Sequence, residues 1–213
     1  MGPCMSETAP LRIGVLASGR GSNFEAIVHA VASRAIPGAV VAVLISDRAD
    51  APALAIARAH GVEPIAIDAR DHPGREVHDK AIADALEERN VGLVCLAGYL
   101  RLLGRDFVRR FADRVLNIHP SLLPAFPGLH AQRQALEYGV RVAGATVHFV
   151  DEGTDTGPIV LQAAVPVHAG DTEASLSARI LAEEHRIYPE AVRLFAEGRI
   201  RFDGRRVQIV ETA

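Results

Sequence analysis

Asn117 and His119 lie two residues apart in the segment NIHPS, residues 117–121 of this 213-residue chain. The apolar residues before Asn117 predict a strand that ends here, and side chains two apart on a strand leave on the same side. An amide beside an imidazole suits acyl-type transfer to an amine. Asn117 can hydrogen-bond an oxygen that becomes negative, and His119 can donate to it or move protons. The spacing alone fits a structural role equally well. In that role Asn117 caps the following turn, and His119 is a half-buried histidine whose hydrogen bonds are satisfied.

Asp155 is the third candidate for chemistry, in the turn sequence GTDTG at 153–157. A carboxylate at the tip of a hairpin can reach a histidine and favour its protonated form. Aspartates are also common in turns for purely local reasons. The role of Asp155 therefore depends on whether the fold brings it to His119.

The glycine-containing turn GRGSN, residues 19–23, follows an apolar run and precedes apolar residues at helical spacing. Free backbone N–H groups and the positive end of the helix dipole converge at such a turn, so we expect an anion there, most simply a phosphate. Arg20 could add charge, and Ser22 or Asn23 could donate or cap the helix. A turn that needs glycine only for its backbone is the alternative. Dinucleotide binding fits less well, because Phe24 stands where G-x-G-x-x-G has its third glycine.

Covalent catalysis is disfavoured by the nucleophiles that the chain offers. Lys80 is the only lysine, so Schiff-base and Walker-type chemistry are nearly excluded. Cys95 stands in the apolar run VGLVCLAG, and Ser121 is not in a G-x-S-x-G sequence.

A metal requirement is also disfavoured. The histidines show no H-E-x-x-H or cysteine-paired spacing. Asp71-His72 and Glu184-His185 could supply ligands, but neither pair has a convergent partner visible in the sequence.

The composition excludes several classes of partner. There are 23 basic and 26 acidic residues, giving a net charge of −3, so no overall basic field indicates nucleic acid. The chain has no apolar run of membrane-spanning length, and its first ten residues do not look like a signal peptide. Cys4 and Cys95 make no disulfide framework. We expect a cytoplasmic protein with neither a membrane nor a nucleic acid as partner.

The elements that must position these residues alternate along the first half of the chain. Short apolar runs at 12–18, 40–45, 64–67 and 91–97 predict strands. Helical stretches follow at 51–59, 75–88 and 107–111. Strands that are apolar on both faces and alternate with helices predict an α/β fold: a doubly wound, mostly parallel sheet with helices on both faces. We expect residues 1–10 to be a disordered N-terminal segment and residues 11–213 to be a single domain.

The second half is expected to contain antiparallel strands. After a strand at 114–118 and a helix at 129–137, strands at 145–150 and 158–167 form a hairpin across residues 153–157. In the strand at 145–150, Ala145, Val147 and Phe149 face one way, and Thr146, His148 and Val150 face the other. This alternation suits a strand that is less fully covered by the rest of the protein. Asp171 is the expected N-cap of a helix over 172–187, which Pro189 should end or kink before a last helical stretch to 196. A small hairpin is expected over 200–210.

Six ordered segments together resemble the family of 10-formyltetrahydrofolate-dependent formyltransferases. They are GRGSN (19–23), LAGYLRLL (96–103), NIHPSLLP (117–124), PGLHAQRQALE (127–137), VHFVDEGTDTGPIVLQ (147–162) and EHRIYP (184–189). The likeness extends from Arg12 to about Glu197. GRGSN is typical of the branch whose acceptor carries a phosphate, and members acting on tRNA or deformylating the folate carry a further domain for which this length leaves no room.

The resemblance implies transfer of a formyl group from 10-formyltetrahydrofolate, a co-substrate, to the amine of glycinamide ribonucleotide in purine biosynthesis. The amine would attack directly through a tetrahedral intermediate, with no metal required. The partners would be these two small molecules, and the protein would be a monomer or a homodimer. The N-terminal half would form the phosphate side of the domain, and the C-terminal half the catalytic and folate side.

The resemblance also implies three groups of site residues. The catalytic residues would be Asn117, His119 and Asp155. The ribonucleotide phosphate would be held by Gly21, Ser22 and Asn23, and its ribose hydroxyls by Glu184. The folate site would be lined by Arg75, Leu100, Arg101, Leu102, Leu103, Asn117, Asp151, Glu152, Gly153, Thr154 and Asp155.

Three alternatives remain open at this point. One is another folate-dependent formyltransferase that acts on a sugar-nucleotide or tRNA amine. The second is a nicotinamide-dependent oxidoreductase that uses the turn at Gly19. The third is a folate- or phosphate-binding module without turnover, which an intact Asn117, His119 and Asp155 argues against.

Overall fold

A seven-stranded sheet forms the centre of the protein in the computed structural model, which describes residues 9–211. The strand order is β3-β2-β1-β4-β5-β6-β7. The first five strands of the chain are parallel to one another, β6 runs antiparallel to β5, and β7 runs antiparallel to β6. The strands are β1 (Leu11–Leu16), β2 (Ala39–Ser46), β3 (Glu63–Ala66), β4 (Leu93–Leu96), β5 (Val115–His119), β6 (Val142–Phe149) and β7 (Ile159–Pro166). The predicted doubly wound sheet with an antiparallel hairpin is confirmed.

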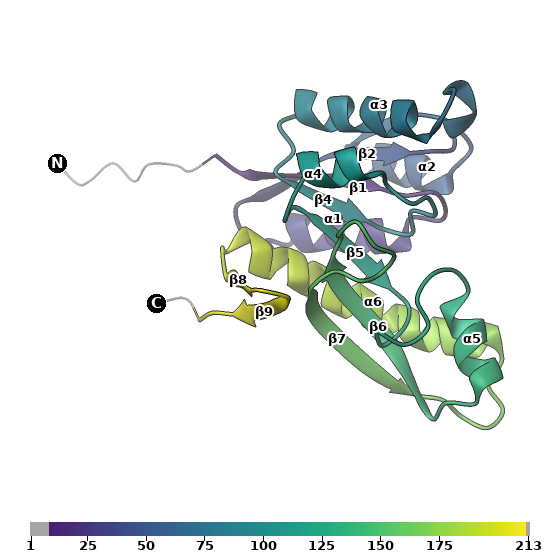
Figure 1. Ribbon diagram of the computed structural model, residues 1–213. Coiled ribbons are helices and arrows are strands. Elements are labelled where there is room, and N and C mark those ends of the chain that lie inside the picture. The colour runs from purple at the N-terminus through teal and green to yellow at the C-terminus, as the bar shows by residue number, and fades with distance from the viewer. Residues whose placement is uncertain (1–8, 212–213) are drawn as a thin grey trace.

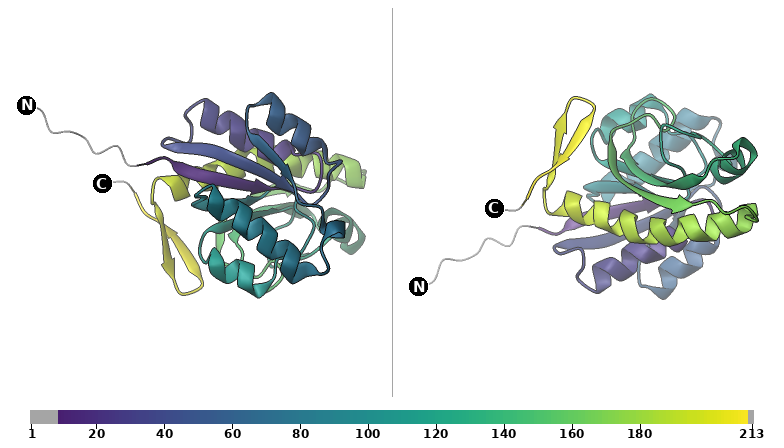
Figure 2. Two further views of the ribbon diagram at one scale, coloured as in Figure 1. Left: turned by 90° about the horizontal axis from the view of Figure 1, so that it is seen from above. Right: turned by 90° about the horizontal axis from the view of Figure 1, so that it is seen from below.

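Helices cover both faces of this sheet (Figures 1 and 2). α1 (Ser22–Ala32), α2 (Pro52–Ala59) and the long α6 (Glu173–Ala196) share one apolar core with the sheet. α3 (Arg75–Glu88) and α4 (Arg105–Arg110) share a second core on the opposite face, after a 3₁₀ turn at Ala69–Asp71. The short α5 (Ala131–Tyr138) packs beside α6. Because both faces are covered, the parallel strands contain almost only apolar residues.

The expectation that β6 would be incompletely covered is wrong. Seven of its eight residues are buried, including Thr146 and His148 on the polar side of the alternation. Thr146 is satisfied internally, because its hydroxyl donates to the Ser121 carbonyl at 2.6 Å and accepts from the Leu123 amide at 3.1 Å. The alternation therefore marks buried polar contacts rather than a solvent-facing side.

The start of α6 also differs from the prediction. Thr172, not Asp171, is the N-cap, and it forms a reciprocal capping box with Ser175. Asp171 instead accepts hydrogen bonds from the guanidinium of Arg179 at 2.8 and 2.9 Å. Asp171 lies one position before the N-cap, so its side chain can form an ion pair with a residue farther along the helix. Arg179 lies about two helical turns away.

Pro189 does not end α6, which continues unbroken to Ala196 (Figure 2). A proline inside a helix removes one backbone hydrogen bond and costs about 3 kcal/mol. The residues around it, Ile187, Tyr188, Ala191 and Val192, are all buried in the core. Burying large apolar side chains yields about 1.5–3 kcal/mol each, so packing outweighs the cost of the proline.

Tyr188 anchors α6 to the middle of the sheet, and its hydroxyl lies 3.0 Å from the Leu96 carbonyl and 2.9 Å from the Leu116 carbonyl. Tyr188→Phe is expected to lower the free energy of unfolding by about 1–3 kcal/mol, because a buried hydrogen bond is lost and its acceptor is left unpaired. Urea unfolding measures this change. Tyr138→Phe, at a side chain 80% exposed, is the control and should change stability little. Equal effects of the two substitutions would contradict the anchoring role.

The chain ends in the expected hairpin of β8 (Ile200–Asp203) and β9 (Arg206–Ile209). Cys95 is a free, fully buried thiol, and burial raises its pKa to about 12. Cys4 and most of the segment expected to be disordered, residues 1–8, lie outside the described residues. Within residues 9–211, none of the helices combines the length and apolar character of a membrane span.

Candidate active site

The strand order of the sheet reverses at the neighbouring strands β1 and β4 (Figure 1). The carboxyl ends of β1, β4 and β5 lie side by side at this edge. β1 leads into the turn at 19–23, β4 into the segment 97–104, and β5 ends at His119. Ligands of open α/β sheets bind at such a switch point, because loops that leave in opposite directions open a crevice there.

Asn117, His119 and Asp155 converge although they are far apart in the sequence. His119 Nδ1 lies 3.4 Å from Asp155 Oδ2, and its Nε2 donates to the Phe126 carbonyl at 2.9 Å. The Gly128 amide donates to Asp155 Oδ2 at 2.7 Å, which fixes the carboxylate. Asp155 has a left-handed backbone with φ 54°. Asn117 completes the group from the same strand as His119.

His148 joins this group and was missed by the sequence analysis. Its Nε2 lies 3.1 Å from Asn117 Nδ2 and 3.6 Å from Asp155 Oδ1. Its Nδ1 lies 2.8 Å from the Phe149 carbonyl, which can only accept, so Nδ1 carries a hydrogen. The contact with His148 Nε2 orients the Asn117 amide, whose nitrogen makes no other hydrogen bond among residues 9–211. His148 could be recognised only from the register of β5 and β6, which places it opposite Asn117. The sequence alone does not give this register.

The electrostatics of the group favour an ionised carboxylate beside a neutral ring. Burial lowers the pKa of His119, and the Phe126 carbonyl and the Asp155 charge raise it without overcoming that effect. Asp155 therefore favours the protonated ring, as expected, but burial outweighs it. Burial would raise the pKa of Asp155, but its contact with His148, the Gly128 amide and the His119 charge together lower it to about 2.

The lowered pKa of His119 predicts a pH dependence of stability. Below the ordinary histidine value of 6.5, the unfolded chain binds a proton that folded His119 does not. The free energy of unfolding should therefore fall as the pH decreases from that value toward the folded pKa, by at most about 1.4 kcal/mol per pH unit for this group. Urea unfolding between about pH 5 and 7.5 measures the slope. His119→Gln should show a shallower slope, and an unchanged slope would contradict the assignment.

The glycine turn presents an uncapped helix N-terminus to the same crevice. Gly21 is the N-cap of α1 in a left-handed conformation with φ 83°, and no side chain caps the helix. Of the two roles considered for Ser22 and Asn23, donating a hydrogen bond or capping the helix, the capping role is therefore excluded. The first helical hydrogen bond runs from the Glu25 amide to the Gly21 carbonyl at 2.9 Å. Among the described residues, no backbone acceptor binds the amides before it, so they are available to an anion.

Glu184 lies directly behind this turn. Asn23 Nδ2 donates to Glu184 Oε2 at 2.7 Å, and both side chains are buried. Burial raises the pKa of Glu184, while the Asn23 hydrogen bond and the Arg20 charge lower it less strongly. The hydrogen bond between Asn23 and Glu184 thus connects α6 to the glycine turn. The other oxygen of the Glu184 carboxylate, Oε1, can accept a hydrogen bond from a polar ligand.

The segment Leu100–Leu103 follows β4 and presents apolar side chains to solvent. Leu100 is 64% and Leu102 59% exposed. The Leu100 amide donates to the Ser18 hydroxyl at 2.9 Å, which ties the segment to the end of β1. Arg101 is exposed between them, and Leu103 packs partly on the core under α3 and α4.

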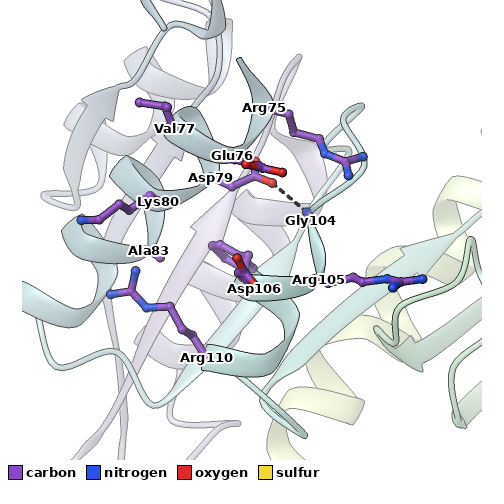
Figure 3. Close-up of a pocket in the computed structure, with 11 residues that line it drawn as sticks. Arg75, Glu76, Val77, Asp79, Lys80, Ala83, Gly104, Arg105, Asp106 and Arg110 are labelled. Atoms are coloured by element: carbon purple, nitrogen blue, oxygen red, sulfur yellow. Dashed lines mark hydrogen bonds between the residues drawn. The ribbon is translucent and has the colours of Figure 1, made fainter. Parts of the chain in front are cut away.

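Arg75 begins α3 and lines a cavity of about 560 Å³ between α3 and α4 (Figure 3). A Cβ atom on Gly104 would lie 3.7 Å from Arg75 Nε, so Arg75 stands next to the end of the segment 100–103. Asp79 Oδ2 accepts from the Gly104 amide at 2.7 Å and joins the two helices (Figure 3). None of the residues that line this cavity belongs to the group around His119.

The loop from Asp151 to Asp155 is held by its own polar contacts. Asp151 Oδ1 accepts from the Gly153 amide at 3.0 Å and from the Thr156 hydroxyl at 2.6 Å. Glu152 pairs with Arg105 at 3.1 Å and with Arg109 at 3.0 Å, which docks the loop on α4. Thr154 is exposed at its tip. These contacts place the loop so that Asp155 reaches His119.

Comparison with known proteins identifies similar chains. A family model described as formyl transferase matches residues 11–192. Phosphoribosylglycinamide formyltransferase of Escherichia coli (strain K12) is 45% identical over 191 residues, which cover 90% of this chain and 90% of that protein. A crystal structure of glycinamide ribonucleotide transformylase 1 from Symbiobacterium toebii superposes with a TM-score of 0.93 and 59% identity, covering 95% of both chains.

A longer relative contains a comparable segment. The trifunctional purine biosynthetic protein adenosine-3 of Drosophila pseudoobscura pseudoobscura is 46% identical over 191 residues, which cover 89% of this chain. This chain spans only 14% of that protein, so the match concerns one part of it.

Proposed function

The chain belongs to the formyl transferase family, and from this we infer that it transfers a formyl group from 10-formyltetrahydrofolate to the amine of glycinamide ribonucleotide in purine biosynthesis. It is therefore an enzyme, and the folate is its co-substrate. The observation that carries this conclusion is the contact of Asp155 with both His119 and His148 at the edge of the sheet that also presents the glycine turn. A module that only bound ligands would not need this arrangement.

For the reaction we propose direct attack of the neutral glycinamide amine on the formyl carbon, which makes a tetrahedral intermediate with a negative oxygen. The second amide hydrogen of Asn117 would stabilise that oxygen, and losing such a donor costs about 100- to 1000-fold in rate. His119 would take a proton from solvent at Nδ1 as the substrates bind, Asp155 would stabilise the imidazolium while the oxygen is negative, and the proton would return to solvent when the products leave. A bound water would carry the proton from the attacking nitrogen to the departing folate nitrogen.

For the ribonucleotide we propose that its phosphate lies against the amides of Gly21, Ser22 and Asn23. The uncapped helix N-terminus supports this, because it supplies free donors and a favourable dipole. Glu184 would bind the ribose hydroxyls, supported by its position one hydrogen bond behind Asn23. Holding two bulky substrates in contact can supply about 7–11 kcal/mol of the barrier.

For the folate we propose the surface of segment 100–103 and the loop 151–155, with Arg75 at its edge. The exposed Leu100 and Leu102 fit a flat aromatic ring system, because they offer apolar area beside the polar ends of β4 and β5. We further propose that residues 11–213 act as one formyltransferase domain, in the cytoplasm, as a monomer or homodimer, with neither nucleic acid nor membrane as partner.

The test is formation of formylglycinamide ribonucleotide from the two substrates by the purified chain. Turnover with glycinamide ribonucleotide and none with a sugar-nucleotide amine or a tRNA supports the proposal, and the reverse preference would overturn it. A crystal soaked with glycinamide ribonucleotide tests the binding mode separately. A phosphate found away from the amides of residues 21–23 would contradict the assignment of that turn.

A further inference from the structure

Three possible metal ligands meet on the face of the protein formed by α1 and α2. Glu25 and His29 stand four residues apart on α1 and therefore share one face of that helix. His60 is the C-cap of α2, the neighbouring helix. The sequence does not reveal this grouping, because His60 lies 31 positions beyond His29 and only helix packing brings them together.

The spacing of these side chains suits a small cation. One ligand atom from each residue, a carboxylate oxygen or an imidazole nitrogen, lies within 4.8 Å of the other two. Glu25 Oε1 and His60 Nε2 are 3.5 Å apart, and the rings of His29 and His60 meet edge to face with centroids 5.1 Å apart. Ligands on a tetrahedral zinc ion are about 3.3 Å apart, so small rotations of exposed side chains would close the set.

These groups are free to coordinate. Within residues 9–211 the His60 ring contacts the Glu25 carboxylate through Nε2, and the His29 ring packs edge to face against the His60 ring. His29 and His60 are exposed at the surface, so an ion can reach them from solvent.

The helix α6, which packs against α1, carries a third imidazole, that of His185. His185 Nε2 is buried without a hydrogen-bond partner among the described residues.

We propose that Glu25, His29 and His60 form a binding site for a divalent transition-metal ion of the zinc class, with water completing its coordination. Two imidazoles and a carboxylate are the donor set that zinc takes in many proteins, whereas magnesium and calcium prefer oxygen ligands alone. The site lies outside both the group around His119 and the cavity between α3 and α4, so its role is separate from formyl transfer.

An ion there would link α1 to α2 just below the glycine turn. The two helices already meet at that turn, where the Ala53 amide donates to the Gly19 carbonyl at 3.1 Å. Metal binding would therefore stabilise the pair of helices that supports the turn, and we expect an increase in Tm of about 5–10 °C when free zinc exceeds its Kd 100-fold.

The experiment uses the untagged full chain, treated with a chelator and titrated with Co²⁺, whose visible absorption bands report tetrahedral coordination, and with Zn²⁺ by calorimetry. We expect one ion per chain, and a loss of affinity of about tenfold or more in His29→Ala, His60→Ala and Glu25→Gln. His168→Ala removes an exposed histidine elsewhere and should bind like the wild type. Thermal unfolding without metal verifies that each variant is folded.

The outcomes decide the proposal. Stoichiometric binding that the three substitutions weaken and His168→Ala does not would support it, together with unchanged kcat in His29→Ala and His60→Ala. No binding by the wild type, or binding that persists in His29→Ala and His60→Ala, would overturn it. Neither result depends on the formyl transfer assay, so failure of this site and failure of the proposed function are distinguishable.

Discussion

Asp155→Asn is expected to lower kcat by about 10²–10⁴-fold while changing the Kd for glycinamide ribonucleotide little. Asparagine has nearly the same shape and can still accept from the Gly128 amide, but it carries no charge. The imidazolium of His119 would then form in a buried site without its counter-ion, and His148 would lose the carboxylate that lies 3.6 Å away. The loss should therefore appear in the chemical step rather than in ribonucleotide binding.

Steady-state kinetics with both substrates, together with calorimetric titration of the ribonucleotide, separates these effects. Asp113→Asn is a matched control, because Asp113 is an exposed aspartate with a similar left-handed backbone, φ 57° against 54° for Asp155. It should retain normal turnover. If Asp155→Asn kept wild-type kcat, or lost binding and turnover in parallel, the proposed role of the carboxylate would be wrong.

Gly21→Ala is expected to raise the KM for glycinamide ribonucleotide by about 10- to 100-fold and to lower the free energy of unfolding by about 2–5 kcal/mol. A Cβ atom at this left-handed position costs about 1–2 kcal/mol. It would also lie 2.7 Å from the Ala53 Cβ and 2.9 Å from its Cα, so α1 or α2 must move, at about 1–3 kcal/mol more. A misplacement of the bound substrate by about 1 Å is enough to lower the reaction rate by about 10²-fold.

Urea unfolding and the KM for each substrate measure the two effects. Gly38→Ala is the control, because Gly38 has a similar left-handed φ of 66° but nothing within 4 Å of the added atom. Gly38→Ala should lower the free energy of unfolding only by the about 1–2 kcal/mol that a Cβ atom costs at a left-handed position, and it should leave the KM for glycinamide ribonucleotide unchanged. Equal loss of stability in the two variants would show that the contact with Ala53 is unimportant, and a normal KM in Gly21→Ala would contradict the phosphate site.

The architecture could be predicted because its signals are local. Each parallel strand is a short apolar run such as residues 91–97, and each crossover helix has its own periodicity, so their alternation already requires a covered parallel sheet. The exceptions lie where packing overrides local preference. Pro189 continues a helix because its neighbours are buried, and the polar side of β6 is covered because Thr146 and His148 bond internally.

By itself, the sequence determined the types of residue available for chemistry: an amide and an imidazole two apart on a strand, a lone aspartate in a turn, and a glycine turn before a helix. Only the tertiary structure decided that Asp155 reaches His119, that His148 orients Asn117, and that Glu25, His29 and His60 meet. The physical reason is that each of these contacts joins residues from different elements. Strand register and helix packing depend on how the whole core is buried, which no local pattern specifies.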